Sequence, residues 1–394
     1  MKASLQWLQS LVPSLEASQN ELIAALTRGG HEVRAVIELD GELDAVDPED
    51  GEVDTDIPCE EAVPTAFDTI LDLADSERGD LLGHVGLARE VAALCRRPFV
   101  PPSVDAPIRV AQGSVQTRID VNVHEGERCP HFGLLVIEDV VVRPSPLWLR
   151  VRLHALGIEP RNNVWDLTQL ATLESGHPVT VFDLAGLEGP LVVRLAEDGE
   201  TLDEGNRKHS LTGDDLVVAD AQGPVALAGV TNASRTDVGA STRQVVFACG
   251  CFAPEGIRCT ADRLGLKTES ERRHRRGVDR NDTAEVLAQA GALATRLAMG
   301  AAVPGTIHVF DEPWEATQVV LSQSAVLEAL DVPLERAKAI LEPLGFEVVP
   351  LHADVHGDGL QVSIPSFRPD VRNEADVMKE IGRIHRAWSS AGIG

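Results

Sequence analysis

The sequence contains no apolar run near the roughly 20 residues that a membrane-spanning helix requires, although 43% of its 394 residues are hydrophobic. Its first eighteen residues carry one lysine and an amphipathic pattern, without the apolar stretch and small-residue cleavage site of a secretory signal. We therefore expect a soluble, cytoplasmic protein without membrane contact. A chain of this length predicts two or three domains, each with its own core.

A nucleotide-binding motif and a metal-binding motif are also missing. The sequence has no Gly-rich phosphate loop, so no nucleotide site is expected in this chain. It has no CxxC pair, and the "CGC" at 249–251 has neither zinc-finger spacing nor a nearby histidine. We interpret the six cysteines as buried free thiols in a reducing cytoplasm; they lie at positions 59, 95, 129, 249, 251 and 259.

Basic residues are scarce, because 35 Lys and Arg face 62 Asp and Glu and leave a net charge of -27. Such acidity repels phosphate backbones, so we expect no DNA partner, and RNA binding would need a local basic patch. Adaptation to salt is an alternative reason for the acidity. The densest basic run, 271–280, predicts either contact with an RNA end or pairing with the chain's own carboxylates. Its arginines are Arg272, Arg273, Arg275 and Arg276.

The pattern of helical and β-rich runs predicts a multidomain α+β fold. Residues 1–100 form an N-terminal α+β domain interrupted at 41–61, where ten of twenty-one residues are acidic and none is basic, which is typical of a solvated linker. Residues 116–303 read as a mixed module with substantial antiparallel sheet. Residues 305–390 predict a small helical module with a strand pair.

Helix boundaries are signalled most clearly at three places. Ser18 and Glu21 have the spacing of a capping box. An apolar-periodic stretch predicts a helix over about 82–97. Asp282, followed by Glu285, predicts the N-cap and box of the last helix in the central module.

Several segments taken together resemble one family. "SPLWLRVRLHALGIEPRNNVWDLT", "LESGHPVTVFDL", "DDLVVADAQGPVALAGV", "RLGLKTES" with "RRGVD", and "IPSFRPDVRNEADVMKEIGRIH" occur in the order found in the bacterial phenylalanyl-tRNA synthetase β chain, and "LTRGGHEV" and "RGDLLGHVGLAREVAAL" fit its first domain. The resemblance extends over nearly the whole chain. It implies a shortened form or paralogue, since the family's OB-type tRNA-binding insertion and its C-terminal half have no counterpart in this sequence.

The resemblance implies that residues 116–303 form an editing-type module, which in the family hydrolyses mischarged tyrosyl-tRNA. The family pocket uses a glutamate to accept the tyrosine hydroxyl, and that position is Ala248 here. An apolar pocket by itself rejects an added hydroxyl poorly, which is why the glutamate is needed. With alanine at this position, we expect the acceptor for the tyrosine hydroxyl to be lost. Other family positions are also altered: an Arg is Glu159, an Asn is Gln169, a His is Thr180, a Gly-Gly pair is Asn232 and Ala233, and an Ala is Ser270. Thr168, Gly229 and Thr268 are retained.

The stretch "GHPVTVFD", residues 176–183, raises the question of whether Thr180 acts as a nucleophile. A threonine hydroxyl needs an adjacent base, and His177 is three positions away. Alternate residues of a strand face opposite sides, so these two side chains would point apart. We interpret Thr180 as a packed or hydrogen-bonded hydroxyl.

The resemblance also implies a metal site of spaced carboxylates in the last module. The corresponding residues are Asp370, Asp376 and Glu380, and Lys379 replaces a fourth acid. Mg²⁺ favours such oxygen ligands. The alternative is a solvated acidic helix start with Asp376 and Glu380 as an i,i+4 pair.

Three functional hypotheses follow. The first is a phenylalanyl-tRNA synthetase β-chain-like protein that works with an α chain and tRNA, without itself transferring the aminoacyl group and without tyrosyl-tRNA editing. The second is a free-standing, non-catalytic module that binds a small amino acid or another protein. The third is a hydrolase of a different aminoacyl ester.

Overall fold

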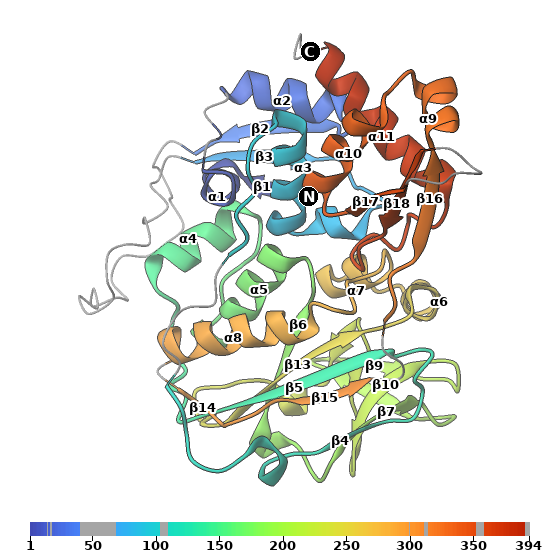
Figure 1. Ribbon diagram of the computed structural model, residues 1–394. Helices are drawn as coiled ribbons and strands as arrows, with labels where there is room; N and C mark the ends of the chain where they lie inside the picture. Colours follow the sequence, from blue (N-terminus) through green and yellow to red (C-terminus); the bar gives the residue numbers. More distant parts are fainter. Residues whose placement is uncertain are drawn as a thin grey trace. The chain divides into compact units, whose positions relative to one another are not determined.

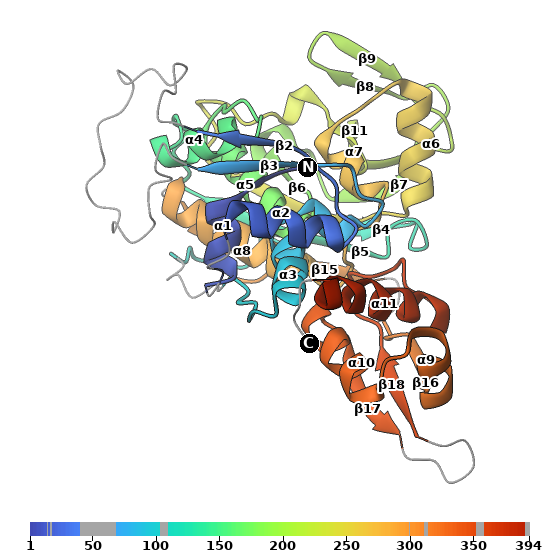
Figure 2. The same cartoon turned by 90° about the horizontal axis from the view of Figure 1, so that it is seen from above.

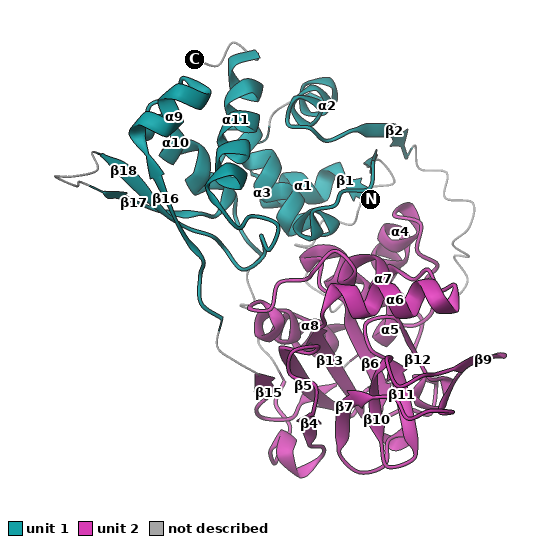
Figure 3. Ribbon diagram, turned by 90° about the vertical axis from the view of Figure 1, so that its right-hand side faces the viewer, with its two compact units in different colours: residues 1–40, 67–102, 314–394 teal, residues 41–66, 103–313 magenta. Residues whose placement is uncertain are grey.

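The computed structural model describes residues 1–13, 15, 18–39, 68–102, 109–298, 300–310, 314–351 and 358–390. They form two compact units (Figure 3). The first unit contains residues 1–40, 67–102 and 314–394, and the second contains 41–66 and 103–313. The first unit is therefore discontinuous in sequence. The acidic linker predicted at 41–61 lies outside the described residues.

The N-terminal part of the first unit is a three-stranded antiparallel sheet with helices. The strand order is β1-β3-β2. Ser18 and Glu21 form the predicted capping box at the start of α2. The bounds are β1 Lys2–Ser4, α1 Leu5–Leu11, α2 Gln19–Arg28, β2 Val33–Glu38, β3 Thr69–Leu73, the 3₁₀ helix η2 Gly79–Leu82 and α3 His84–Cys95.

The C-terminal part of the first unit has a second three-stranded antiparallel sheet, ordered β16-β18-β17, with three helices (Figure 2). Its last helix, α11, packs against α2 and α3, so the two distant parts of the sequence share one unit. The bounds are β16 Gln318–Ser322, α9 Gln323–Leu330, α10 Leu334–Leu341, the 3₁₀ helix η6 Glu342–Leu344, β17 Glu347–Leu351, β18 Gly359–Ser363 and α11 Glu374–Ser390.

Gly86 lets α3 approach η2 at backbone distance. A Cβ atom at this position would lie 1.9 Å from the Asp80 carbonyl oxygen. We expect Gly86→Ala to lower the free energy of unfolding by about 1–3 kcal/mol, because the backbone must shift to admit the methyl group. Gly382→Ala in α11 is the matched control, since the nearest atom there is the flexible end of Leu330, 3.1 Å away. Urea unfolding of both variants tests this, and equal stabilities would contradict it.

The second unit contains two facing sheets. One has the order β14-β5-β13-β6, with β15 also paired to β5, and the other has the order β12-β11-β10-β7-β4. All neighbouring pairs are antiparallel except β4 and β7. The bounds are β4 Val121–Val123, β5 His131–Glu138, β6 Val179–Asp183, β7 Leu191–Leu195, β10 Leu216–Asp220, β11 Gly223–Leu227, β12 Thr231–Asn232, β13 Val245–Cys251, β14 Ala301–Ala302 and β15 Ile307–Phe310.

Alternation along β5 explains how this sheet is covered on both faces. Phe132, Leu134 and Val136 belong to the core shared with the second sheet. The intervening residues face α8, where Gly133 and Gly291 allow close packing against Leu287 and Leu135. In Figure 1, α5 and α8 lie on one side of β5 and β13. The strand is buried on both faces, and its residues are accordingly almost all apolar.

The remaining elements of the second unit include a hairpin, β8–β9, that projects from the sheets (Figure 2). The 3₁₀ helices are η3 Val115–Thr117, η4 Leu184–Gly186 and η5 Ser234–Thr236. The others are α4 Leu147–Ala155, α5 Asn163–Ser175, β8 Thr201–Glu204, β9 Arg207–Ser210, α6 Pro254–Leu264, α7 Glu269–His274 and α8 Thr283–Leu297. No helix among the described residues is long and apolar enough to span a membrane.

The predicted α+β class is confirmed, and some local expectations need correction. The helix predicted over 82–97 is η2 followed by α3. Asp282 starts α8 without a side-chain capping bond, because its carboxylate binds His177 instead. Cys259 is exposed and Cys95 is partly exposed, so the expectation of buried thiols holds for Cys129, Cys249 and Cys251, while Cys59 lies outside the described residues.

The expected division at 1–100, 116–303 and 305–390 stays a prediction. The structure adds one fact about its second boundary: β15, at 307–310, pairs with β5 and lies in the second unit.

Candidate functional site

The second unit contains a cavity of about 650 Å³. Its walls come from α5, from the strands β6, β11 and β13, from the segment at 228–232, and from α7. Its lining mixes apolar and polar side chains. Eight residues predicted from the sequence line the cavity together, namely Thr168, Gln169, Thr180, Gly229, Asn232, Ala248, Thr268 and Ser270, while Glu159 is not among the lining residues.

The pairing of β6 with β13 places a polar and an apolar side chain next to each other in the cavity wall. Thr180 lies opposite Ala248 in the antiparallel register. Both line the cavity, with Thr180 half-buried and Ala248 buried. Paired residues share one face of a sheet. A hydroxyl and a methyl group therefore stand side by side on this wall.

His177 is not positioned as a base for Thr180. Its Nδ1 lies 2.6 Å from Asp282 Oδ1, and its Nε2 lies 3.1 Å from the Gly250 carbonyl oxygen. Burial lowers the pKa of His177, but the Cys249 sulfur and the Asp282 carboxylate together raise it well above the usual value. Burial also raises the pKa of the Cys249 thiol, so the Asp282 carboxylate is the charged partner that keeps the proton on the His177 ring. His177 is a buried imidazolium with a structural role.

His274 is a second buried imidazole, and it does line the cavity. Burial, reinforced by His177, lowers the pKa of His274 to about 4, so the ring is neutral at pH 7. Its Nε2 lies 3.0 Å from the Gly250 carbonyl oxygen, which can only accept. Nδ1 lies 3.0 Å from the Ser270 carbonyl oxygen, to which it donates in one tautomer, and 3.3 Å from the Ser270 hydroxyl, from which it accepts when the proton is on Nε2. The same hydroxyl can instead donate to the Gly229 carbonyl oxygen at 2.9 Å.

The exposed side of the cavity carries charges that the motifs did not reveal. Arg161, just before α5, lines the cavity, and its guanidinium carbon lies 4.3 Å from the centre of the Trp165 ring. Glu204 and Asp237 line it as well. Arg161 lies two residues after Glu159, and its closeness in sequence to a predicted pocket position is the one signal that could have drawn attention to it.

The basic run at 271–280 is largely paired within the chain. Arg273 binds Glu269 at 2.5 Å, Arg272 lies 3.3 Å from the same carboxylate, and Arg275 binds Asp262 at 2.7 Å. Arg276 donates to the Arg272 carbonyl oxygen at 3.1 Å. These contacts follow the alternative of internal pairing, and contact with RNA stays a prediction.

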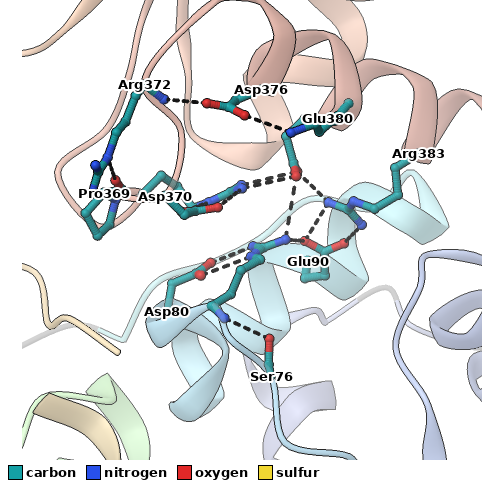
Figure 4. Close-up of polar contacts among 12 residues, drawn as sticks. Ser76, Asp80, Glu90, Pro369, Asp370, Arg372, Asp376, Glu380 and Arg383 are labelled. Carbon is teal, nitrogen blue, oxygen red and sulfur yellow. Dashed lines mark hydrogen bonds and ion pairs between the residues drawn. The ribbon is translucent and has the colours of Figure 1, made fainter. Parts of the chain in front are cut away.

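The three carboxylates predicted to hold Mg²⁺ lie in the first unit, each beside a cation (Figure 4). Arg368 binds Asp370 at 2.8 Å and Glu380 at 3.1 Å, and Lys379 binds Asp376 at 3.0 Å. Glu380 is buried, so it is not part of a solvated helix start. Within the described ranges no cluster of three or more His, Cys, Asp or Glu side chains could hold a metal ion. These residues as arranged do not fit a magnesium site.

The comparisons with known proteins give the class first. The B3/4 domain model matches residues 128–299, and the tRNA synthetase B5 domain model matches residues 321–386. The chain thus combines a B3/4 domain with a B5 domain of tRNA synthetases.

Curated relatives then give the family. Phenylalanine–tRNA ligase beta subunits are 35% identical to this chain in three organisms: Salinibacter ruber over 325 residues, covering 81% of this chain and 38% of the relative; Thermotoga maritima over 312 residues, covering 78% and 38%; and Rhodopirellula baltica over 323 residues, covering 81% and 46%. This chain belongs to the phenylalanine–tRNA ligase beta-subunit family and spans less than half the length of these relatives. An N-terminal fragment of the Pyrococcus horikoshii phenylalanyl-tRNA synthetase beta subunit aligns over 98% of this chain and 99% of the fragment, with 15% identity and a TM-score of 0.48.

Proposed function

We propose that this protein works with a phenylalanine–tRNA ligase α chain and tRNA, and that its B3/4 cavity accepts an aminoacyl group without editing tyrosyl-tRNA. Family membership supports the first part. The Thr180–Ala248 wall carries the second part, because the methyl group of Ala248 offers no acceptor for a tyrosine hydroxyl. A site that lacks such an acceptor discriminates tyrosine from phenylalanine weakly.

The purified chain is expected to deacylate tyrosyl-tRNA no faster than buffer alone, and Thr180→Val is expected to behave identically. Release of labelled tyrosine from charged tRNA measures this. Co-purification with an α chain, and a tRNA gel shift at low salt, test the association. Rapid hydrolysis abolished by Thr180→Val would overturn the assignment of Thr180 as a packed hydroxyl.

A second candidate is hydrolysis of a different aminoacyl ester, and the Ser270–His274 contact favours it. In such a reaction the serine oxygen would attack the ester carbonyl as the Ser270 proton passes to His274, and the ester C–O bond would break as His274 returns that proton to the departing tRNA hydroxyl. Water would then hydrolyse the acyl-serine, releasing the amino acid and restoring the Ser270 hydroxyl. Ser270→Ala should then abolish hydrolysis of phenylalanyl-tRNA while leaving tRNA binding intact. If the wild-type chain hydrolyses no aminoacyl-tRNA, this candidate fails.

A further inference from the structure

The exposed rim of the B3/4 cavity has one positive and two negative side chains close together. Arg161 and Asp237 are exposed, and Glu204 is half-buried. Burial raises the pKa of Asp237, while Arg161 lowers it and Glu204 raises it further, so Asp237 lies in the field of both other charges. The rim therefore offers a cation and a carboxylate pair to whatever enters.

Arg161 is held ready for an anion. Its guanidinium stacks on Trp165 at 4.3 Å, and within the described part of the chain it forms no ion pair. Stacking fixes the plane of the guanidinium and leaves its N–H groups available along the edge. A planar carboxylate is the partner to which the guanidinium can donate two parallel hydrogen bonds.

The two carboxylates of the rim differ in how fully they are engaged. Glu204 accepts from the Thr231 hydroxyl at 2.5 Å and lies 2.9 Å from His209 Nε2. Asp237 forms no side-chain hydrogen bond or ion pair to any residue that the structure describes. Carboxylate oxygens accept several bonds each. Asp237, together with the negative charge of Glu204, is therefore suited to an ammonium group.

The cavity behind this rim is suited to an apolar side chain. Its inner wall contains Phe132, Val181, Val218, Ala248 and Phe252. A volume of about 650 Å³ accommodates one amino acid and lies within the usual range for small-molecule sites.

From this arrangement we infer that the cavity binds a free α-amino acid with an apolar side chain, whose carboxylate is held by Arg161 and whose ammonium is held by Asp237 and Glu204. The inference rests on the proposed function only in taking the cavity as a site for an amino-acid side chain and its α-amino group, and it names the free acid as the ligand. An aminoacyl ester has no carboxylate for Arg161, so the free acid is the better match.

Calorimetric titration of the full chain with three probes tests the inference. L-phenylalanine carries both charges, L-phenylalaninamide lacks the carboxylate, and 3-phenylpropionate lacks the ammonium. We expect the amide and the propionate each to bind about tenfold or more weakly than phenylalanine, as loss of one charge-assisted contact predicts. Equal binding of phenylalanine and its amide would favour an aminoacyl ester and overturn the inference, as would no binding of phenylalanine.

Two variants locate the contacts. Arg161→Gln should lower the affinity for phenylalanine to that for the amide and leave the affinity for the amide unchanged. Asp237→Asn should lower the affinities for phenylalanine and for its amide by the same factor. Arg258→Gln, which alters an exposed arginine of α6 away from the cavity lining, is the matched control and should bind as the wild type does. Phenylalanine binding that is insensitive to Arg161→Gln would contradict the assignment. Because these titrations contain neither α chain nor tRNA, their failure is distinguishable from failure of the proposed association.

Discussion

Glu90→Gln is expected to lower the free energy of unfolding by about 3–5 kcal/mol, since it removes one partner from a buried ionic cluster. The Glu90 side chain is fully buried, and its carboxylate lies between Arg78, at 2.9 Å, and Arg383. Arg383 also binds Glu380 at 2.6 Å (Figure 4). With glutamine at position 90, two arginines that are largely buried lose a shared negative charge.

The pH dependence of this effect follows from the carboxylate pKa values. Burial raises the pKa of Glu90, but Arg383 and Arg78 outweigh it and hold it well below the usual value; Arg383 and Arg368 similarly lower the pKa of Glu380 to about 2. Groups with lowered folded-state pKa values stabilise the fold above about pH 4.3, the unfolded value, and lose that contribution as the pH falls toward the folded value. The difference between wild type and Glu90→Gln should therefore shrink below about pH 4.

Urea unfolding measures the stability, and hydrogen exchange in peptides from α3 and α11 assigns the change to the first unit. Lys379→Gln is the control, because the Lys379 side chain is 75% exposed and its pair with Asp376 should contribute nothing measurable. If Glu90→Gln proved as stable as Lys379→Gln, the cluster would not be needed to join these helices.

Asp282→Asn is expected to destabilise the second unit by about 2–4 kcal/mol at pH 6, somewhat less than for a fully buried pair because the Asp282 side chain is 26% exposed. The substitution leaves His177, which is 1% exposed, without its counter-charge. Thermal unfolding and hydrogen exchange of α8 peptides measure the loss.

The sign of the pH dependence is opposite to that of Glu90. The folded-state pKa of His177 is raised, so its contribution is fully present below about pH 6.5 and is lost as the pH rises through the folded value. The stabilities of wild type and Asp282→Asn should converge as the pH rises above the folded-state pKa of His177, and the His177 pKa measured by NMR should fall in the variant. A gap that widens with pH would contradict the assigned pair.

Local sequence signals predicted local structure well in this chain. The Ser18–Glu21 capping box depends on neighbouring residues only, and it is present as expected. Eight residues that the family resemblance had singled out line one cavity. The predictions were weaker where a side chain has a choice of partners, as at Asp282, which binds a histidine 105 positions away instead of capping its helix.

The charged groups of the sites illustrate the same limit. Asp370 and Glu380 have the spacing that the resemblance implies for a metal, yet Arg368 occupies both carboxylates. Glu204 and Asp237 reach the cavity from a hairpin and from the segment after η5, and no short motif connects them with Arg161. Only the tertiary fold places these three charges at one rim.

The discontinuous first unit has a consequence for biosynthesis. Glu90 is made early, whereas Arg383 follows 293 residues later. Residues 103–313, the larger part of the second unit, lie between them in sequence, and domains generally fold as units during synthesis. Until α11 emerges, Glu90 and the apolar face of α3 lack their distant partners and resemble an unfinished interface. The second unit can therefore complete its folding on the ribosome first, and the N-terminal segment must wait, available to chaperones, until synthesis of α11 closes the first unit.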